Sequence, residues 1–147
     1  MTRIRDTSPP GARVFKARLQ VQWADVDVAG VMYFAAYSRF AEYAEMQLFA
    51  ELGFPYENVF ERYSFWLPRV HVEAEYHAPA LMSDWLLMRT HLKRVGASSL
   101  HWRTLFVNER TGEAGAAMTV LVVAVDARTM KSRPLPEAIR SVLLACV

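Results

Sequence analysis

The feature that most constrains the fold is a stretch of helical periodicity that is apolar over most of its circumference. Its apolar residues recur at spacings of three and four, which marks one face of a helix: Phe34, Tyr37, Ala41, Ala44, Leu48 and Leu52. Other apolar residues lie off this face: Phe40, Tyr43 and Phe49. Gly53 and Pro55 end the pattern, which predicts a helix over about residues 35–52. Because such a helix must be covered on most sides, we expect it to be central, wrapped by a sheet or by a second subunit.

The segments on both sides of this helix alternate with a period of two, as half-buried strands do. In the first of them one face carries Phe15, Ala17, Leu19, Val21 and Trp23. Later runs of the same kind cover residues 70–77, 86–93 and 100–106, and a run over residues 116–125 is apolar on both faces. Short turns between successive strands imply an antiparallel sheet. The sequence therefore predicts an α+β fold, in which a curved antiparallel five-stranded sheet wraps around one long central helix.

The length predicts a single domain over residues 1–147, with residues 1–12 flexible and a short helix beginning near Pro136. The chain carries 17 basic and 15 acidic residues, a net charge of +2, and no basic cluster interleaved with aromatic residues, which argues against a nucleic-acid partner. Its most apolar run, AGAAMTVLVVAV, is shorter than the roughly 20 residues that span a bilayer. With no signal-peptide pattern and one cysteine, Cys146, the composition favours a soluble cytoplasmic protein with no membrane partner.

Several kinds of functional site are disfavoured. No G-x-S-x-G motif and no phosphate-binding glycine loop occur, so neither a serine-hydrolase elbow nor a nucleotide site is supported. The run DVDVAG matches the opening of a calcium loop, but Ala29 and Ala36 stand where an oxygen ligand and a glutamate are required. One strand face carries four polar residues: His71, Glu73, Glu75 and His77. Their spacing of about 6–7 Å is too wide for one ion to bind all four, so we predict no metal and a solvated or interface face.

Two aspartates, Asp25 and Asp27, stand between the first strand and the helix. One interpretation is that they are cap and turn residues, which accept hydrogen bonds from the free N–H groups at the helix start. The other is that the same N–H groups, at the positive end of the helix dipole, stabilise an oxyanion beside an ionised aspartate. Such an arrangement is a workable acyl-transfer site. The spacing by itself leaves both interpretations open.

Residues 21–53 resemble the active-site segment of the hotdog-fold acyl-CoA thioesterases, in the 4-hydroxybenzoyl-CoA thioesterase family: VQWADVDVAGVMYFAAYSRFAEYAEMQLFAELG. The family pattern is a strand, D-x-D-x-x-G-x-V/I-x-[YF], a nearby tyrosine and a long helix, matched here by Asp25, Asp27, Gly30, Val31, Tyr33, Phe34 and Tyr37. Three later segments resemble the family's other strands and its closing proline loop: EAEYHAPALMSDWLLMRTHL, GASSLHWRTLF and VVAVDARTMKSRPLP. The resemblance implies a hotdog fold and hydrolysis of an acyl- or aroyl-CoA thioester, with no cofactor besides the coenzyme A of the substrate.

By this resemblance, Asp27 is the catalytic carboxylate, acting as nucleophile or general base, and the backbone N–H of Phe34 is the oxyanion donor. Asp25 is expected to orient the site without reacting. The expected substrate-binding residues, the last two as candidates for holding the coenzyme A phosphates, are Gly30, Tyr33, Tyr37, Trp66, His77, Lys131 and Arg133. The resemblance also implies a homodimer or homotetramer, because the helix of one subunit and the sheet of its partner form the pocket in this family.

The chain departs from the family pattern at several positions. Phe34 stands where many relatives carry histidine, and Leu81 stands where an arginine is common. Gly96 and Ala97 replace a basic pair of the aromatic thioesterase, so the nucleotide end of coenzyme A must be held by other residues. Two alternatives stay open. One is a hotdog hydratase or dehydratase, for which His77 would be the catalytic histidine, and the other is a non-catalytic acyl-CoA binding protein, which needs no reactive aspartate.

Overall fold

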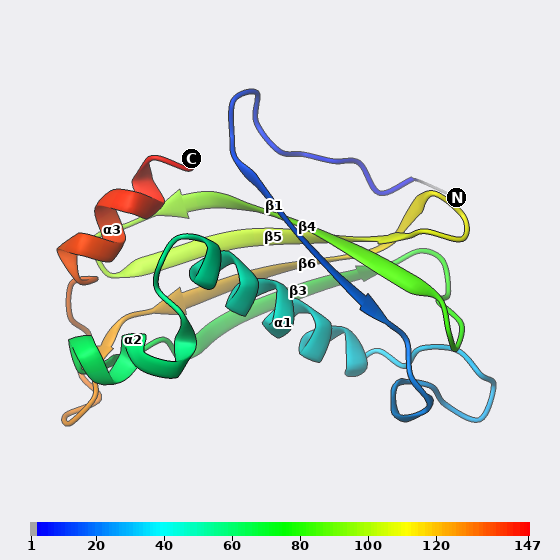
Figure 1. Cartoon of the computed structure of the whole chain (residues 1–147), viewed down its shortest axis with the longest axis horizontal. Coiled ribbons are helices and arrows are strands. Elements are labelled where there is room, and N and C mark those ends of the chain that lie inside the picture. Colours follow the sequence, from blue (N-terminus) through cyan, green and yellow to red (C-terminus); the bar gives the residue numbers. More distant parts are fainter. Residues whose placement is uncertain (1–2) are drawn as a thin grey trace.

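One sheet and one long helix make up most of the protein (Figure 1). The structure, a computed structural model, describes residues 3–147. Helix α1 (Ala36–Glu51) lies across one face of a five-stranded antiparallel sheet whose strand order is β1-β4-β5-β6-β3. The strands are β1 (Val14–Gln20), β3 (Arg69–Tyr76), β4 (Trp85–Val95), β5 (Ser99–Asn108) and β6 (Glu113–Val123). The predicted α+β architecture, a five-stranded antiparallel sheet around one long helix, is confirmed.

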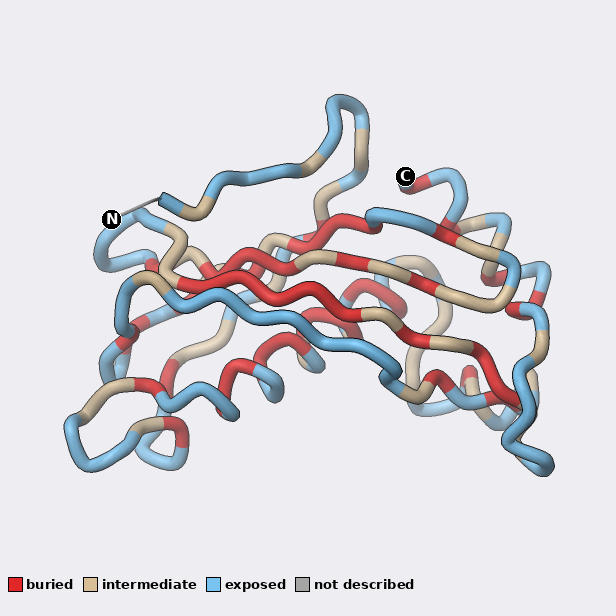
Figure 2. Tube along the Cα trace, turned by 180° about the vertical axis from the view of Figure 1, so that it is seen from behind, coloured by how far each residue is buried: buried red, intermediate tan, exposed pale blue. Residues whose placement is uncertain are grey.

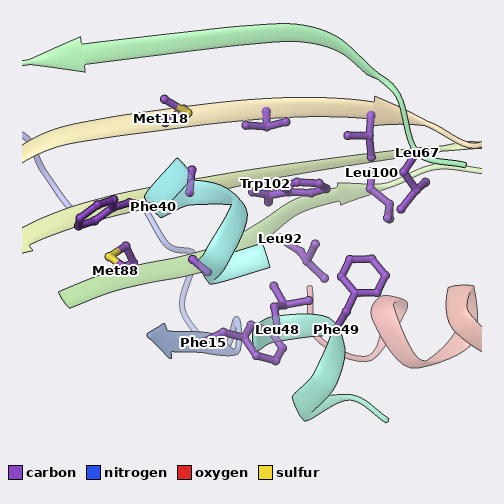
Figure 3. Close-up of a cluster of buried hydrophobic side chains, with 14 of the residues drawn as sticks. Phe15, Phe40, Leu48, Phe49, Leu67, Met88, Leu92, Leu100, Trp102 and Met118 are labelled. Atoms are coloured by element: carbon purple, nitrogen blue, oxygen red, sulfur yellow. The ribbon is translucent and has the colours of Figure 1, made fainter. Parts of the chain in front are cut away.

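The hydrophobic core lies between α1 and the sheet (Figure 3). Trp102 of β5 pairs with Leu92 of β4 and Val120 of β6, and these three buried side chains form a row on the helix side of the sheet. Phe40 and Phe49, which lie off the apolar stripe of α1, are 0% and 1% exposed. Burying an aromatic side chain of this size stabilises a fold by about 1.5–3 kcal/mol. The broad apolar surface of α1 is therefore used largely within one protomer.

Three small elements beyond the sheet and α1 are not predicted by the sequence patterns. They are helix α2 (Tyr56–Tyr63) and the strands β2 (Phe65–Trp66) and β7 (Val125–Asp126), which pair with each other. Helix α2 has eight residues and the two strands have two each, and periodicity is not distinguishable over such lengths. The short C-terminal helix is predicted correctly as α3 (Glu137–Leu144), which follows Pro136.

The run over residues 70–77 was predicted as a half-buried strand, but all residues of β3 are exposed in the protomer, including Val70 and Val72 of its predicted apolar face. Two further residues of predicted apolar faces lie outside the elements assigned to them. Strand β1 ends before Trp23, which is 81% exposed and belongs to a single 3₁₀ turn, η1 (Trp23–Asp25). The chain turns there because the carboxylate of Asp25 accepts a hydrogen bond from the N–H of Gln22 at 2.8 Å. Phe34 precedes α1 and is 73% exposed, so its place in the apolar stripe of the helix was a wrong prediction. In both cases the apolar spacing in the sequence continues past the end of the strand or helix, into a turn where the regular geometry no longer holds.

The segment before β1 contacts the sheet through two ion pairs. Arg3 pairs with Glu113 at 2.7 Å, and Asp6 pairs with Arg89 at 3.2 Å. Exposed ion pairs of this kind contribute little to stability. The flexibility of residues 1–12 therefore stays a prediction, and residues 1–2 lie outside the described part of the chain. In residues 3–147 no helix combines the length and the hydropathy that crossing a bilayer requires.

Asp84, just before β4, ties three segments together. Its carboxylate accepts hydrogen bonds from the N–H of Leu81 at 2.8 Å and from the amide of Asn108 at 2.8 Å. The guanidinium of Arg110 donates two more, at 2.7 and 3.0 Å. The hydrogen bonds from Arg110 are the main reason why the pKa of Asp84 is lowered to about 2. This carboxylate therefore anchors the loop after β3 to the hairpin between β5 and β6.

Asp84→Asn is expected to lower the free energy of unfolding by about 1–2 kcal/mol at pH 7, since half-exposed Arg110 screens part of the charge. The folded-state pKa lies below the unfolded one, so this stabilisation is complete above about pH 4 and is lost as the pH falls toward 2. Urea unfolding at pH 7 and pH 3 would measure it, with Glu61→Gln, at an exposed position of α2, as control. An equal effect at both pH values would contradict this assignment.

Candidate active site

The chain between β1 and α1 folds into a loop that is fastened to the loop after β3. The N–H of Val21 donates to the carbonyl of Asp84 at 2.8 Å, and the N–H of Met32 donates to the carbonyl of Ala80 at 2.8 Å. A β-bridge joins Val31 to Leu81. Two segments that are about 50 residues apart in the sequence are thus held side by side and form the walls of one site.

Asp25 is buried and holds this loop against the helix. Its carboxylate forms an ion pair with Arg39 of α1 at 2.5 Å, in addition to the hydrogen bond from Gln22. Its backbone carbonyl accepts a hydrogen bond from the N–H of Tyr33 at 3.1 Å. With both oxygens of its carboxylate engaged, Asp25 positions the loop and is not free to react. The ion pair between Asp25 and Arg39 was not predicted, because nothing in the spacing of these two residues in the sequence links them.

Asp27 is exposed, and one of its oxygens is held by the loop. Its Oδ1 accepts a hydrogen bond from the N–H of Ala29 at 2.8 Å and a longer one from the N–H of Val31 at 3.4 Å. Gly30 has a φ of +75°, which a glycine adopts without strain. Within the described residues nothing donates to Oδ2 of Asp27. The carboxylate is oriented through one oxygen and free at the other.

A cavity of about 520 Å³ opens beside this carboxylate. Its lining is Trp23, Val26, Asp27, Val28, Gly30 and Met82. The side chains that line the cavity are therefore apolar, apart from the single charge of Asp27. An apolar group of a ligand can lie against this lining without leaving a buried polar group unpaired. Met82 was not foreseen, because only the bridge between the two loops brings it to this place.

The start of α1 lies next to this loop. A β-bridge joins Val26 to Met32, which places the residues after Met32 beside Asp27. The backbone N–H groups of Phe34 and Ala35 donate to no acceptor in residues 3–147, whereas the carbonyl of Phe34 accepts a hydrogen bond from the hydroxyl of Tyr76 at 3.2 Å. Free N–H donors at a helix start are the groups that bind a developing oxyanion.

Tyr37 packs behind the helix start, with its ring edge-on to those of Tyr76 and Phe106, each with 5.2 Å between ring centroids. Burial raises the pKa of Tyr37, and burial also raises the pKa of Tyr76. Both phenols are therefore protonated at neutral pH. They can donate hydrogen bonds, and neither is suited to act as a base.

A carboxylate with one free oxygen, beside unpaired backbone donors and an apolar cavity, is the arrangement expected of an acyl-transfer site. Comparison with known proteins agrees with that chemistry: the family model described as "Thioesterase-like superfamily" matches residues 21–143. The chain belongs to the thioesterase-like superfamily.

Relatives of this thioesterase-like chain cover most of its length. It is 33% identical over 127 residues to the acyl-CoA thioester hydrolase YbgC of Escherichia coli O157:H7, a match that covers 86% of this chain and 92% of YbgC. It is 30% identical over 125 residues to a 1,4-dihydroxy-2-naphthoyl-CoA hydrolase of Synechococcus sp. strain CC9605, covering 81% and 82% of the two chains. The prediction of a thioester hydrolase is confirmed at the level of the family.

The fold is shared with solved thioesterases. A 1,4-dihydroxy-2-naphthoyl-CoA thioesterase from Synechocystis superposes with a TM-score of 0.82 at 23% identity, covering 90% of this chain and 96% of that one. The sheet and central helix of the thioesterase-like chain are those of the hotdog fold, as the resemblance implies.

The structure brings most of the predicted site residues of this thioesterase-like chain to one end of α1. Around the loop and the helix start lie Asp25, Asp27, Gly30, Tyr33, Phe34 and Tyr37. His77 follows Tyr76 in the sequence, but side chains alternate between the faces of a strand, and His77 lines a different cavity with Ile4 and Glu113. It is near the site in sequence and turned away from it in space.

Trp66 pairs with Val125, which is also bridged to Ser132, so the segments that carry Trp66, Lys131 and Arg133 lie together. These segments lie near α2, at the other end of the protomer (Figure 1). The indole N–H of Trp66 donates to the carbonyl of Ala127 at 3.3 Å, and Arg133 donates to the carbonyl of Tyr63 at 3.0 Å. Trp66 and Tyr76 are ten residues apart in the sequence, and the eight residues of strand β3 (Arg69–Tyr76) lie in this stretch, so the two side chains are separated by up to about 33 Å. Within one protomer these three residues are therefore far from Asp27.

Proposed function

We propose that this protein hydrolyses an acyl- or aroyl-CoA thioester to the free acid and coenzyme A. The observation that carries the proposal is the exposed carboxylate of Asp27, held through one oxygen and open at the other to an apolar cavity. The two curated relatives support the reaction class, since one is named an acyl-CoA thioester hydrolase and the other a 1,4-dihydroxy-2-naphthoyl-CoA hydrolase.

In the proposed mechanism Asp27 supplies the nucleophile that neutral water lacks. As a general base it removes a proton from water, whose oxygen attacks the thioester carbonyl carbon. As a nucleophile it attacks that carbon directly, and water hydrolyses the resulting anhydride. In both routes the carbonyl oxygen becomes an oxyanion that accepts a hydrogen bond from the N–H of Phe34, the C–S bond breaks, and coenzyme A leaves as a thiol after protonation.

The remaining features of the proposal concern the ligand and the assembly. The mechanism requires no metal and no cofactor besides the substrate's own coenzyme A. The aromatic residues at the site, Tyr33, Phe34 and Tyr37, suit an aroyl or medium-length acyl group. Lys131 and Arg133 are the proposed partners of the coenzyme A phosphates. We propose a homodimer or homotetramer, and a cytoplasmic location.

The position of His77 favours hydrolysis over hydration. A hydratase needs a histidine at the reacting carbon atoms, and His77 lines the cavity beside Glu113 on the other face of the strand. A non-catalytic binding protein would have no need for a carboxylate with a free oxygen at the helix start. The geometry therefore supports a thioesterase better than either alternative.

Thioester hydrolysis can be measured as release of free thiol from a panel of short, medium-length and aromatic CoA thioesters. We expect at least one aroyl or medium-chain substrate to be turned over with a kcat/KM of about 10⁴ M⁻¹s⁻¹ or more. Enoyl-CoA hydration, followed on the same samples, is expected to be absent. Tight binding of a CoA thioester without release of thiol would instead support a binding protein.

A further inference from the structure

The carbonyl of Phe34 lies just outside the hydrogen-bond ladder of α1. The helix begins at Ala36 with Ala35 as its N-cap, so the first carbonyl of the ladder is that of Ala35. The N–H of Ser38, four residues after Phe34, donates to the carbonyl of Ala35 at 3.2 Å. The carbonyl of Phe34 accepts a hydrogen bond from the hydroxyl of Tyr76 instead, at 3.2 Å. A side chain therefore takes the place of a backbone donor of the helix.

Tyr76 is the last residue of β3, a strand whose eight residues are all exposed and which follows the sheet edge in pale blue (Figure 2). Its ring is nevertheless held, because it packs edge-on against the ring of Tyr37 in the first turn of α1, with 5.2 Å between the centroids. Tyr37 is 4% exposed and packs in turn against the buried ring of Phe106 on β5. This row of three rings fixes the hydroxyl of Tyr76 at the helix start.

The hydrogen bond from Tyr76 acts on the peptide unit that joins Phe34 to Ala35. A trans peptide is planar, and its C=O and N–H groups point in opposite directions. Fixing the carbonyl of Phe34 therefore also fixes the N–H of Ala35. Ala35 has helical dihedrals, φ −70° and ψ −25°, so this N–H is directed out of the helix start. A donor to the carbonyl also polarises the amide, which makes its N–H a stronger donor.

The two free N–H groups at the helix start are thus oriented by different hydrogen bonds. The N–H of Phe34 belongs to the peptide whose carbonyl, that of Tyr33, accepts the N–H of Ala36 at 3.1 Å. The backbone of the turn orients this group, whereas the N–H of Ala35 depends on Tyr76. Adjacent backbone N–H groups serve as paired oxyanion donors, and the carboxylate of Asp27 with its apolar cavity marks a ligand site beside them.

We propose that the N–H of Ala35 is a second donor to the oxyanion, beside that of Phe34, and that Tyr76 is the residue that positions it. Tyr76 touches no reacting atom and acts through the peptide that it orients. The inference rests on the proposed function, because an oxyanion forms only if a thioester carbonyl is attacked at this site. It extends the candidate site to the last residue of β3.

Tyr76→Phe removes the hydroxyl and keeps the ring that packs on Tyr37. The N–H of Ala35 stays present and loses only its orientation, so kcat on the best CoA thioester is expected to fall about tenfold, less than the roughly 10²–10³-fold for a deleted donor. KM is expected to change little, because the bound substrate carries no oxyanion. The control is Tyr43→Phe, at a half-buried position further along α1, which is expected to leave kcat unchanged.

Two CoA analogues separate the oxyanion from the rest of the ligand. A trifluoromethyl ketone in place of the thioester binds as a tetrahedral oxyanion after addition of Asp27 or water, whereas a thioether has no carbonyl oxygen. In Tyr76→Phe the Kd of the ketone is expected to rise about tenfold, in step with the loss of kcat, and that of the thioether to change less than about twofold. Equal weakening of both analogues would mean general support of the site and would overturn the positioning role.

Amide proton resonances report the two donors without turnover. In the wild type, binding of the ketone is expected to shift the amide protons of both Phe34 and Ala35 downfield. In Tyr76→Phe the shift at Phe34 is expected to persist and the shift at Ala35 to shrink. A ketone that shifts Phe34 and leaves Ala35 unchanged in the wild type would overturn Ala35 as a donor.

Failure of the proposed function would give a different result. A wild-type protein that releases no thiol from any CoA thioester, or an Asp27→Asn variant as active as wild type, would overturn the thioesterase itself, whatever the effect of Tyr76→Phe. An active wild type, with Tyr76→Phe retaining kcat within about twofold, would overturn the role of Tyr76 alone. Kinetics of the wild type and the three variants, measured on one substrate panel, separate these outcomes.

Discussion

Asp27→Asn is expected to lower kcat on the best CoA thioester by about 10²–10⁴-fold, the usual contribution of a positioned base. The asparagine side chain has the same shape, and its carbonyl oxygen can still accept the N–H of Ala29. Only the negative charge at the free oxygen is removed. The melting temperature is therefore expected to change little. Steady-state kinetics on an aroyl-CoA and a medium-chain acyl-CoA, with thermal unfolding of the same samples, would measure both.

The matched control for this prediction is Asp25→Asn, two residues away. Asp25 is buried, and the substitution weakens its ion pair with Arg39, so its main effect is expected on the melting temperature, with a smaller loss of kcat. If Asp27 were only a turn residue, its substitution would cost at most about 1 kcal/mol of stability and leave turnover nearly normal. Hydrolysis by Asp27→Asn within threefold of wild type would show that the carboxylate mechanism is wrong.

Arg69→Met is expected to lower the free energy of unfolding by about 3 kcal/mol. Arg69, at the start of β3, forms an ion pair with Glu45 of α1, whose side chain is only 2% exposed. The hydroxyl of Tyr56 on α2 donates a hydrogen bond to the same carboxylate. Without Arg69 a buried carboxylate loses its charged partner, which typically costs 3–5 kcal/mol, and the partial exposure of Arg69 favours the lower value.

The pH dependence of this loss has a definite sign. Burial, the largest influence, raises the pKa of Glu45 even with Arg69 present, and removing the cation raises it further. A raised carboxylate pKa means that the folded state favours the neutral form, so the destabilisation is full above the folded pKa and shrinks as the pH falls below it. Urea unfolding of Arg69→Met is therefore expected to show a smaller deficit at pH 5 than at pH 8.

The double variant Glu45→Gln/Arg69→Met separates the buried charge from the loss of packing. The double variant also removes the buried charge of Glu45, which Arg69→Met leaves without a partner. It is therefore expected to recover most of the lost stability. A double variant as unstable as Arg69→Met would place the effect in the packing of the arginine side chain. Glu45, Tyr56 and Arg69 join α1, α2 and β3, so the stability of this cluster affects the whole fold.

Much of the fold was predictable, because the patterns that specify it are local. The spacing of Tyr37, Ala41, Ala44 and Leu48 marks the buried side of α1, and alternation marks four strands of the main sheet, β1, β3, β4 and β5. Both repeat over enough residues to stand out. Helix α2 and the β2–β7 pair span too few residues for a period to be recognised, and Trp23 shows that a period extended past a turn assigns the wrong face.

The sequence by itself determined the fold class, the family and the loop that carries Asp25 and Asp27, because each of these depends on a pattern within one continuous segment of the chain. Only the tertiary structure decided that Asp25 is buried on Arg39 while Asp27 faces a cavity, although both are aspartates of one motif. It also decided that Met82 lines this cavity. Burial and charge pairing depend on residues that are distant in the chain. No local pattern specifies which of these distant residues come into contact. The carboxylates of Asp25 and Asp27, two residues apart, therefore acquire different surroundings only when the chain is folded.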